Sequence, residues 1–77
     1  MRLWEGFHHD KKTPILITVD YDEELDLILV EVTRGYDKDS VTYTPKHLPE
    51  DGLMHISDVE KSVKASNNLI KELRRRK

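Results

Sequence analysis

Hydrophobic and polar side chains alternate along the first long apolar stretch of the chain, residues 14–22. Its odd-numbered positions hold β-branched and aromatic residues, namely Ile15, Ile17, Val19 and Tyr21. The return run, residues 25–32, is almost wholly apolar. A period of two over such residues predicts strands, so we expect the two runs to pair as a β-hairpin. A register with Tyr21 opposite Asp26 collects the β-branched residues of both runs on one face, and we favour it for that reason.

The second run also predicts where the hairpin lies in its sheet. In the favoured register, the leucines fall on the face opposite the β-branched set: Leu16, Leu25, Leu27 and Leu29. A strand that is apolar on both faces is typical of the middle of a sheet whose two faces are covered. We therefore expect residues 25–32 to form a central strand that is buried on both sides.

Two further segments predict additional strands. Residues 40–44 alternate again and end before Pro45, which suits an edge strand because proline cannot donate to a ladder. Residues 34–39 predict a turn in which Gly35 supplies a positive φ. Alternation in the N-terminal segment, residues 1–13, allows a fourth strand. We expect the apolar side chains of that segment to cover a flank of the sheet, and an exposed anchor for a partner is the alternative; they are Leu3, Trp4 and Phe7.

The periodicity changes from two to that of a helix near residue 57. Ser57 and Glu60 have the spacing of a capping box, in which each side chain satisfies the backbone amide of the other residue. Residues with helical spacing then follow: Val59, Val63, Ser66 or Asn67, Ile70 and Leu73. The pattern predicts an amphipathic helix over residues 57–75, with this stripe as its buried face.

These elements predict one α+β domain over residues 1–77. It consists of a small antiparallel β-meander over residues 14–44, with three or four strands, followed by the C-terminal helix. A chain of 77 residues has a small core, and it contains no cysteine to stabilise that core by disulfides. No apolar run approaches the ~20 residues that span a bilayer, and no signal-peptide segment is evident. We therefore expect a cytoplasmic protein that does not enter a membrane.

Charge is distributed unevenly, although the net charge of the chain is only −2. Residues 1–60 hold 14 acidic side chains against 6 lysines and arginines, whereas residues 61–77 hold 1 against 7. Five carboxylates fall within the seven residues of the hairpin turn: Asp20, Asp22, Glu23, Glu24 and Asp26. The sequence therefore predicts an acidic body with a basic helical end.

The carboxylates of the turn also suggest calcium. Oxygen-bearing side chains from Asp20 to Glu31 occupy positions 1, 3, 5, 7 and 12 of an EF-hand-type loop. Leu25 stands where that loop needs glycine, and the flanking runs predict strands in place of helices. We expect no EF-hand, and a weak calcium site of another kind is left open. We expect no specific metal site, no cofactor and no enzymatic activity, because the chain lacks a phosphate loop, a nucleophile elbow and a zinc motif.

Two functional hypotheses follow from the charges. The first is an interaction protein that presents the acidic hairpin to a basic protein partner, for example as a nucleic-acid mimic that inhibits a nucleic-acid-binding protein. The residues that contact the partner would be the five carboxylates of the turn together with Asp37 and Asp39 of the next loop. The alternative is direct binding of nucleic acid by the basic helix end, through Lys64, Lys71, Arg74, Arg75, Arg76 and Lys77. The turn can also be no more than a solvated loop.

Self-association is a further possibility that the sequence raises. One helix can cover only one face of the sheet, so either residues 1–13 or a second copy in a homodimer would supply the cover for the other face, and the homodimer is the more economical solution. The basic end of one copy could also pair with the acidic turn of another.

Overall fold

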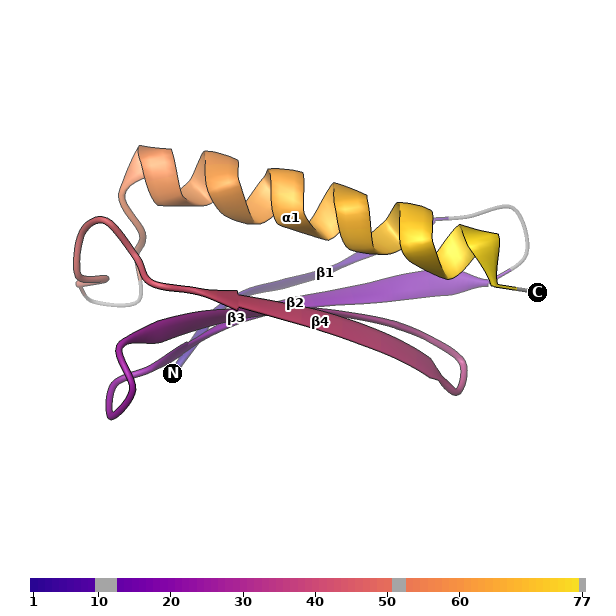
Figure 1. Cartoon of the computed structure of the whole chain (residues 1–77), viewed down its shortest axis with the longest axis horizontal. Helices are drawn as coiled ribbons and strands as arrows, with labels where there is room; N and C mark the ends of the chain where they lie inside the picture. The colour runs from indigo at the N-terminus through magenta and orange to yellow at the C-terminus, as the bar shows by residue number, and fades with distance from the viewer. Residues whose placement is uncertain (10–12, 51–52, 77) are drawn as a thin grey trace.

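The computed structural model describes residues 1–9, 13–50 and 53–76. Four strands precede one helix: β1 (Arg2–His9), β2 (Pro14–Asp22), β3 (Leu27–Arg34), β4 (Asp37–Tyr43) and α1 (Ile56–Arg75). The strands form one antiparallel sheet in the order β1-β2-β3-β4, and α1 runs along one face of it (Figure 1). The predicted α+β meander with a C-terminal helix is confirmed, and the N-terminal segment provides the fourth strand.

The core lies between α1 and the β-branched face of the hairpin. Its sheet residues are those that the alternation placed on one face: Ile15, Ile17, Val19, Tyr21, Ile28, Val30 and Val32. The predicted sidedness is therefore confirmed, but the predicted register is wrong by two residues, because Tyr21 pairs with Ile28 and not with Asp26. Asp26 has φ 52° and belongs to the loop between the strands. A two-residue shift leaves every side chain on its predicted face.

α1 contributes Leu69, Ile70 and Leu73 to this core. It packs over β3 and β4 and reaches β2, but no Cα atom of α1 lies within 8 Å of a Cα atom of β1. The buried face predicted for its first half is wrong, since Val59 and Val63 are 36% and 52% exposed. The residues that face the sheet there are Asp58, Ser62 and Ser66.

Asp58 accounts for this rotation of the helix. Its two carboxylate oxygens accept hydrogen bonds from the backbone amides of Lys46 and His47, at 3.0 and 3.2 Å. The side chain is turned toward the segment that connects β4 to α1, so its neighbour Val59 is turned away from the sheet core. Tyr43 adds a hydrogen bond from its hydroxyl to the Asp58 carbonyl, at 2.9 Å.

The start of α1 also differs from the predicted capping box. The helix begins at Ile56, and His55 is the N-cap residue. The Ser57 amide donates to His55 Nδ1 at 3.2 Å, so Ser57 lies inside the helix and does not cap it. The capping box with Glu60 is therefore wrong. Histidine is not among the residues that favour N-cap positions, so local sequence rules point to the serine.

The sheet face opposite α1, called the open face below, is covered by no helix or strand of the described residues. β3 is central, as predicted, but no described part of the chain covers its second face, so cover by a second copy stays a prediction. Leu27 and Leu29 are partly exposed on this face, and Leu25 is 67% exposed in the loop. Beside these leucines the open face carries threonines and ion pairs. One such pair joins Lys38 Nζ and Glu31 Oε1, which lie 3.7 Å apart.

The two edge strands differ from their predicted forms. β4 begins at Asp37, three residues before the predicted start, because Gly35 and Tyr36 alone make the turn. Gly35 has φ 59°, as predicted, and it occupies the first central position, as in a type II′ turn. In β1 the expected covering role is wrong for Trp4 and Phe7, which are 51% and 61% exposed. Of the three apolar residues there, only Leu3 packs against the core.

Within the ranges described, no helix is both long and apolar enough to cross a membrane.

Candidate functional site

The loop between β2 and β3 carries the carboxylates singled out in the sequence, and residues 20–26 are called the acidic tip below. Asp22 organises this loop: its Oδ1 accepts hydrogen bonds from the amides of Glu24 and Leu25, at 3.0 and 3.2 Å. This is an Asx turn, which ends the strand and turns the chain through its own side chain. Glu23 and Glu24 are exposed, and their carboxylates make no hydrogen bond or ion pair with any described residue.

Asp26 closes the loop on the helix side of the sheet. Its Oδ1 accepts a hydrogen bond from the Tyr21 hydroxyl at 2.7 Å. This hydrogen bond, together with burial of the phenol and the negative charges of Asp26, Glu23 and Asp22, raises the pKa of Tyr21 to about 12. Asp26 is therefore an internal partner of Tyr21, and it is the carboxylate of the acidic tip that is least suited to an external ligand.

Asp20 lies on the open face and is paired within the chain. Arg2 Nε donates to Asp20 Oδ1 at 2.7 Å, and Arg2 Nη1 lies 2.8 Å from Glu5 Oε2. The hydrogen bond that Arg2 donates to Asp20 is the main cause that raises the pKa of Arg2. Both partners of the pair are partly exposed, so the pair is screened and contributes little to stability. Asp20 retains an oxygen for a further ligand.

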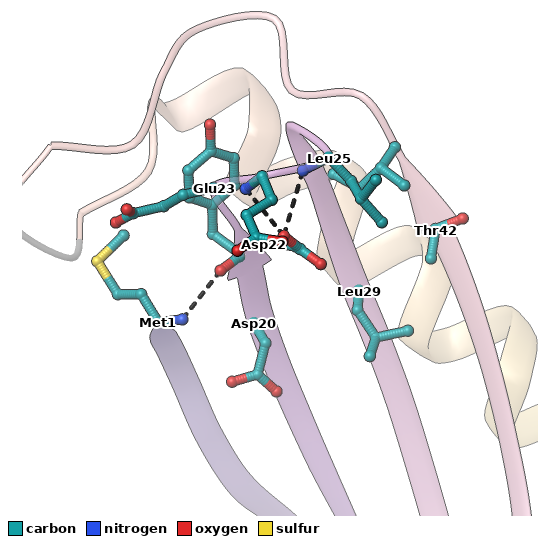
Figure 2. Close-up of a pocket in the computed structure, with 10 residues that line it drawn as sticks. Met1, Asp20, Asp22, Glu23, Leu25, Leu29 and Thr42 are labelled. Atoms are coloured by element: carbon teal, nitrogen blue, oxygen red, sulfur yellow. Dashed lines mark hydrogen bonds between the residues drawn. The ribbon is translucent and has the colours of Figure 1, made fainter.

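These carboxylates border a concave area of the open face, which is called the acidic depression below (Figure 2). It has a volume of about 820 Å³, and all four strands or their ends contribute to its lining. Leu27 and Leu29 of β3 and Thr42 of β4 form an uncharged floor, while Asp20, Asp22, Glu23 and Glu24 supply its acidic border. Such a combination of an apolar floor and an anionic rim suits a long cationic side chain, whose methylene stem is apolar and whose end is charged.

The uncharged part of this depression was missed by reasoning from charge alone. The sequence did contain an indication of this uncharged floor, namely the leucines on the second face of the hairpin. They were expected to be covered, so they were not considered as part of an exposed surface. Thr42 joins them because β4 pairs it with Leu29, and only the strand pairing places it there.

Asp37 and Asp39, which the sequence added to the acidic surface, do not lie at the acidic tip. Asp37 pairs with Arg34 at the far end of β3, about 20 Å from the loop at ~3.3 Å per strand residue. Asp39 Oδ2 lies 3.3 Å from Arg76 Nη2, so it is an ion-pair partner of the helix end. The meander reverses direction between the two loops, which separates residues that a linear view of the sequence brings together.

The C-terminal end of α1 lies at the end of the molecule opposite the acidic tip (Figure 1). Its three arginines all have partners within the chain: Arg74 lies 3.0 Å from His8, Arg75 lies 3.2 Å from Glu72, and Arg76 lies 3.3 Å from Asp39. Arg34 of β3 donates to the carbonyl oxygens of Leu73 and Arg76, at 2.8 and 3.3 Å. The positively charged end is therefore fastened to the sheet.

Two lysines of the basic candidates differ from these arginines. Lys64 and Lys71 are exposed on the outward side of α1 and make no ion pair with any residue in the described ranges. They lie two helical turns apart, about 10 Å along the axis. Lys77, the last basic candidate, lies outside the described residues.

The carboxylates do not form a metal site in the part of the chain that the structure describes. No group of three or more histidine or acidic side chains there is arranged to hold an ion. The loop is flanked by β2 and β3, whereas an EF-hand requires helices on both sides. Asp20 pairs with Arg2 on the open face, whereas Asp26 accepts a hydrogen bond from Tyr21 on the helix side of the sheet, so the two carboxylates are directed to different faces.

Comparison of the chain with protein-family models, with curated proteins and with solved structures gives no significant match.

Proposed function

We propose that this chain is a non-enzymatic protein-interaction module that receives a basic segment of a partner protein at the acidic depression. The observation that carries the proposal is the juxtaposition of leucines and carboxylates on an uncovered sheet face. A lysine or arginine of the partner would lay its methylene stem over Leu27 and Leu29 and would direct its charge toward Asp20, Asp22 or Glu23.

The separation of charges supports this role. The acidic tip and the basic helix end lie at opposite ends of a molecule that is 37 Å long. At physiological salt the Debye length is about 8 Å, so the cations at the far end hardly weaken the attraction of the tip for a basic ligand. Electrostatic steering toward the tip would speed association and would depend on salt.

Mimicry of nucleic acid is a narrower form of the same proposal. A duplex presents one negative charge per ~1.7 Å along its axis, over its whole length. The carboxylates of the acidic tip gather at one end of the sheet, and Asp37 and Asp39 are partly neutralised by Arg34 and Arg76. The geometry therefore favours recognition of one short basic segment over imitation of an extended phosphate array.

A titration with a short arginine- and lysine-rich peptide tests the proposal. Amide chemical shifts should change at residues 20–29 and at Thr42, and the affinity should fall steeply with salt. Replacing both Glu23 and Glu24 by glutamine should weaken binding by roughly tenfold, since each lost exposed pair is worth up to ~1 kcal/mol. Asp22 is left intact in this variant because its carboxylate holds the turn.

A matched control removes the same charge elsewhere. Glu50→Gln with Asp37→Asn changes the net charge equally but lies outside the acidic tip, so it should leave the affinity within about twofold. Equal weakening by both double variants would mean that only net charge matters, and it would refute a defined site. Shift changes confined to α1 would refute it as well.

Nucleic-acid binding by α1 is the second candidate. The specific observation in its favour is that Lys64 and Lys71 share the outward side of the helix and are not paired with described carboxylates. Anisotropy with labelled duplex and single-stranded DNA at roughly 50 and 200 mM salt tests it, because phosphate contacts weaken strongly over that range. Lys64→Gln and Lys71→Gln should each flatten the salt slope by about one unit.

The proposal has two remaining parts. The chain forms a homodimer through the open face, and it acts in the cytoplasm. A second copy would cover Leu16, Leu27 and Leu29, which α1 leaves partly exposed. Sedimentation tests this arrangement, and a monomer at high micromolar concentration would rule it out. A dimer through this face would also compete with the basic peptide for the acidic depression.

A further inference from the structure

A second concave surface lies on the other side of the sheet, between α1 and the strands that α1 does not cover. This groove has a volume of about 510 Å³. Its walls are Trp4 on one side and Val59 and Val63 on the other, and Leu53 and Met54 close one end. Trp4 is 51% exposed, Val63 52% and Leu53 73%, so several large apolar side chains gather at one exposed place. A contiguous exposed apolar surface of this kind marks an interaction site.

The two serines inside the groove are already hydrogen-bonded within α1, and Asn67 is the exposed polar side chain of its lining. The Ser62 hydroxyl donates to the Val59 carbonyl at 2.8 Å, and the Ser66 hydroxyl donates to the Val63 carbonyl at 2.9 Å. Neither serine needs a partner from outside. The apolar walls therefore supply most of the contact with an occupant, and Asn67 is the side chain that could add a hydrogen bond.

The width of the sheet indicates what kind of element fits. Neighbouring strands lie about 4.8 Å apart, so four strands give a sheet nearly twice as wide as the ~10 Å diameter of a helix. α1 packs mainly over β3 and β4 and reaches β2, and it meets β1 at its C-terminal end, where Arg74 lies 3.0 Å from His8. The uncovered surface is the strip above β1, where Trp4 is exposed beside the buried Ile17 and Val19 of β2, and a helix seated there would lie along the edge of the sheet beside α1. Such a helix would insert its apolar stripe between Trp4 and Val63.

The charges beside the groove indicate the polar residues of that helix. The outward surface of α1 that adjoins Val59 and Val63 carries Lys64 and Lys71, with Glu60 as its carboxylate. A helix docked beside α1 would bring its flanking side chains near these lysines, so acidic flanks are favoured and basic flanks are repelled. A second copy of the chain is disfavoured for the same reason, because its own α1 would bring Lys64 and Lys71 against those of the first copy.

We infer that the groove between α1 and β1 binds an amphipathic helix with acidic flanks from another protein. Its apolar stripe would pack on Trp4, Val59 and Val63, and its carboxylates would meet Lys64 and Lys71. This site is independent of the acidic depression, since the two lie on opposite faces of the sheet.

The single tryptophan makes the test direct, because Trp4 lines the groove and reports on it alone. The probes are two designed helical peptides without tryptophan, of about 16 residues, with the same leucine stripe at helical spacing. One has glutamates flanking the stripe and the other has lysines. The full chain should bind the glutamate peptide with a saturable blue shift of Trp4 emission, and roughly tenfold more tightly than the lysine peptide.

Two variants establish the site. Val63→Asp should lower the affinity for the glutamate peptide by about tenfold or more, because it places a carboxylate among the apolar contacts of the groove. The matched control is Val41→Asp, since Val41 is 40% exposed on the other side of α1, and this variant should bind normally. Lys64→Glu combined with Lys71→Glu should reverse the preference, so that the lysine peptide binds more tightly.

Other results would overturn the inference. No saturable shift with either peptide would show that the groove does not receive a helix. Equal affinity for the two peptides, or an unchanged preference in the double lysine variant, would show that Lys64 and Lys71 do not select the partner. Self-association that Val63→Asp abolishes would assign the groove to a second copy of the chain.

Discussion

Replacement of Asp58 by alanine should be among the most destabilising single changes to a charged residue in this chain. The Asp58 side chain is 2% exposed, and it holds the segment between β4 and α1 through the amides of Lys46 and His47. It also lies in the first turn of α1, where a negative charge is favourable. Alanine removes both acceptors, the favourable charge and the restraint on how α1 is rotated about its axis.

The magnitude follows from these contacts. A hydrogen bond to a charged acceptor contributes about 1.5–3 kcal/mol, and the helix-dipole contribution adds about 0.3–1 kcal/mol. Lys46 and His47 are exposed, so water recovers part of the loss at their amides. We expect the free energy of unfolding to fall by about 2–4 kcal/mol, which corresponds to a decrease in Tm of roughly 10–25 °C for a domain of this size.

Urea unfolding followed by far-ultraviolet circular dichroism measures this change. The matched control is Glu60→Ala, which removes an exposed carboxylate from the first turns of the same helix and should change stability by less than about 0.5 kcal/mol. A loss below ~1 kcal/mol for Asp58→Ala would refute the reasoning, because two hydrogen bonds to a buried carboxylate are expected to contribute more than that. A large loss for Glu60→Ala would instead assign the effect to negative charge at the start of α1 and not to the contacts of Asp58.

Three further changes have definite expected outcomes. Because the pKa of Tyr21 is raised to about 12, its stabilising contribution is complete below pH ~10 and is lost as the pH rises toward 12. Tyr21→Phe should therefore reduce the loss of stability over that range in urea titrations, and a variant that loses as much as the parent would contradict the role of the Asp26 hydrogen bond. Gly6→Ala should displace the Trp4 indole, since a Cβ atom at position 6 would lie 2.8 Å from the Trp4 ring, and an unchanged Trp4 emission spectrum would contradict the close packing. Gly35→Ala should lower the free energy of unfolding by about 1–2 kcal/mol in thermal melts, because its φ of 59° is strained for alanine although space is available; a neutral effect would argue against the tight turn.

The order and type of the elements could be predicted from local patterns. Alternation and helical spacing are properties of consecutive residues, so they identified the hairpin, its buried face and the C-terminal helix. The face that contains Ile15 and Val30 survived an error of two residues in the register, because only an odd shift exchanges the faces of a strand. The face on which a side chain lies can therefore be predicted from the sequence more reliably than the residue with which it pairs.

The two surfaces proposed for binding depended on the tertiary structure. The sequence identified Glu23 and Glu24 as acidic, but the leucine floor beside them exists because α1 covers only the other face of the sheet. The groove beside Val63 exists because Asp58, a residue that looked like a solvated helix-start acid, is buried instead and turns the valines outward. Local rules cannot anticipate a hydrogen bond between Asp58 and a segment 11 or 12 residues away.

By itself the sequence determined the α+β class, the chain order of the elements and the presence of an acidic hairpin and a basic helix end, because these follow from composition and from short-range periodicity. Only the tertiary structure decided which charges lie together. It separated Asp37 and Asp39 from the acidic tip, and it bound Arg74 and Arg76, at the C-terminal end of α1, to His8 and Asp39 of the sheet. The physical reason is that an antiparallel meander sends successive loops to opposite ends of the sheet, so nearness along the chain does not give nearness in space.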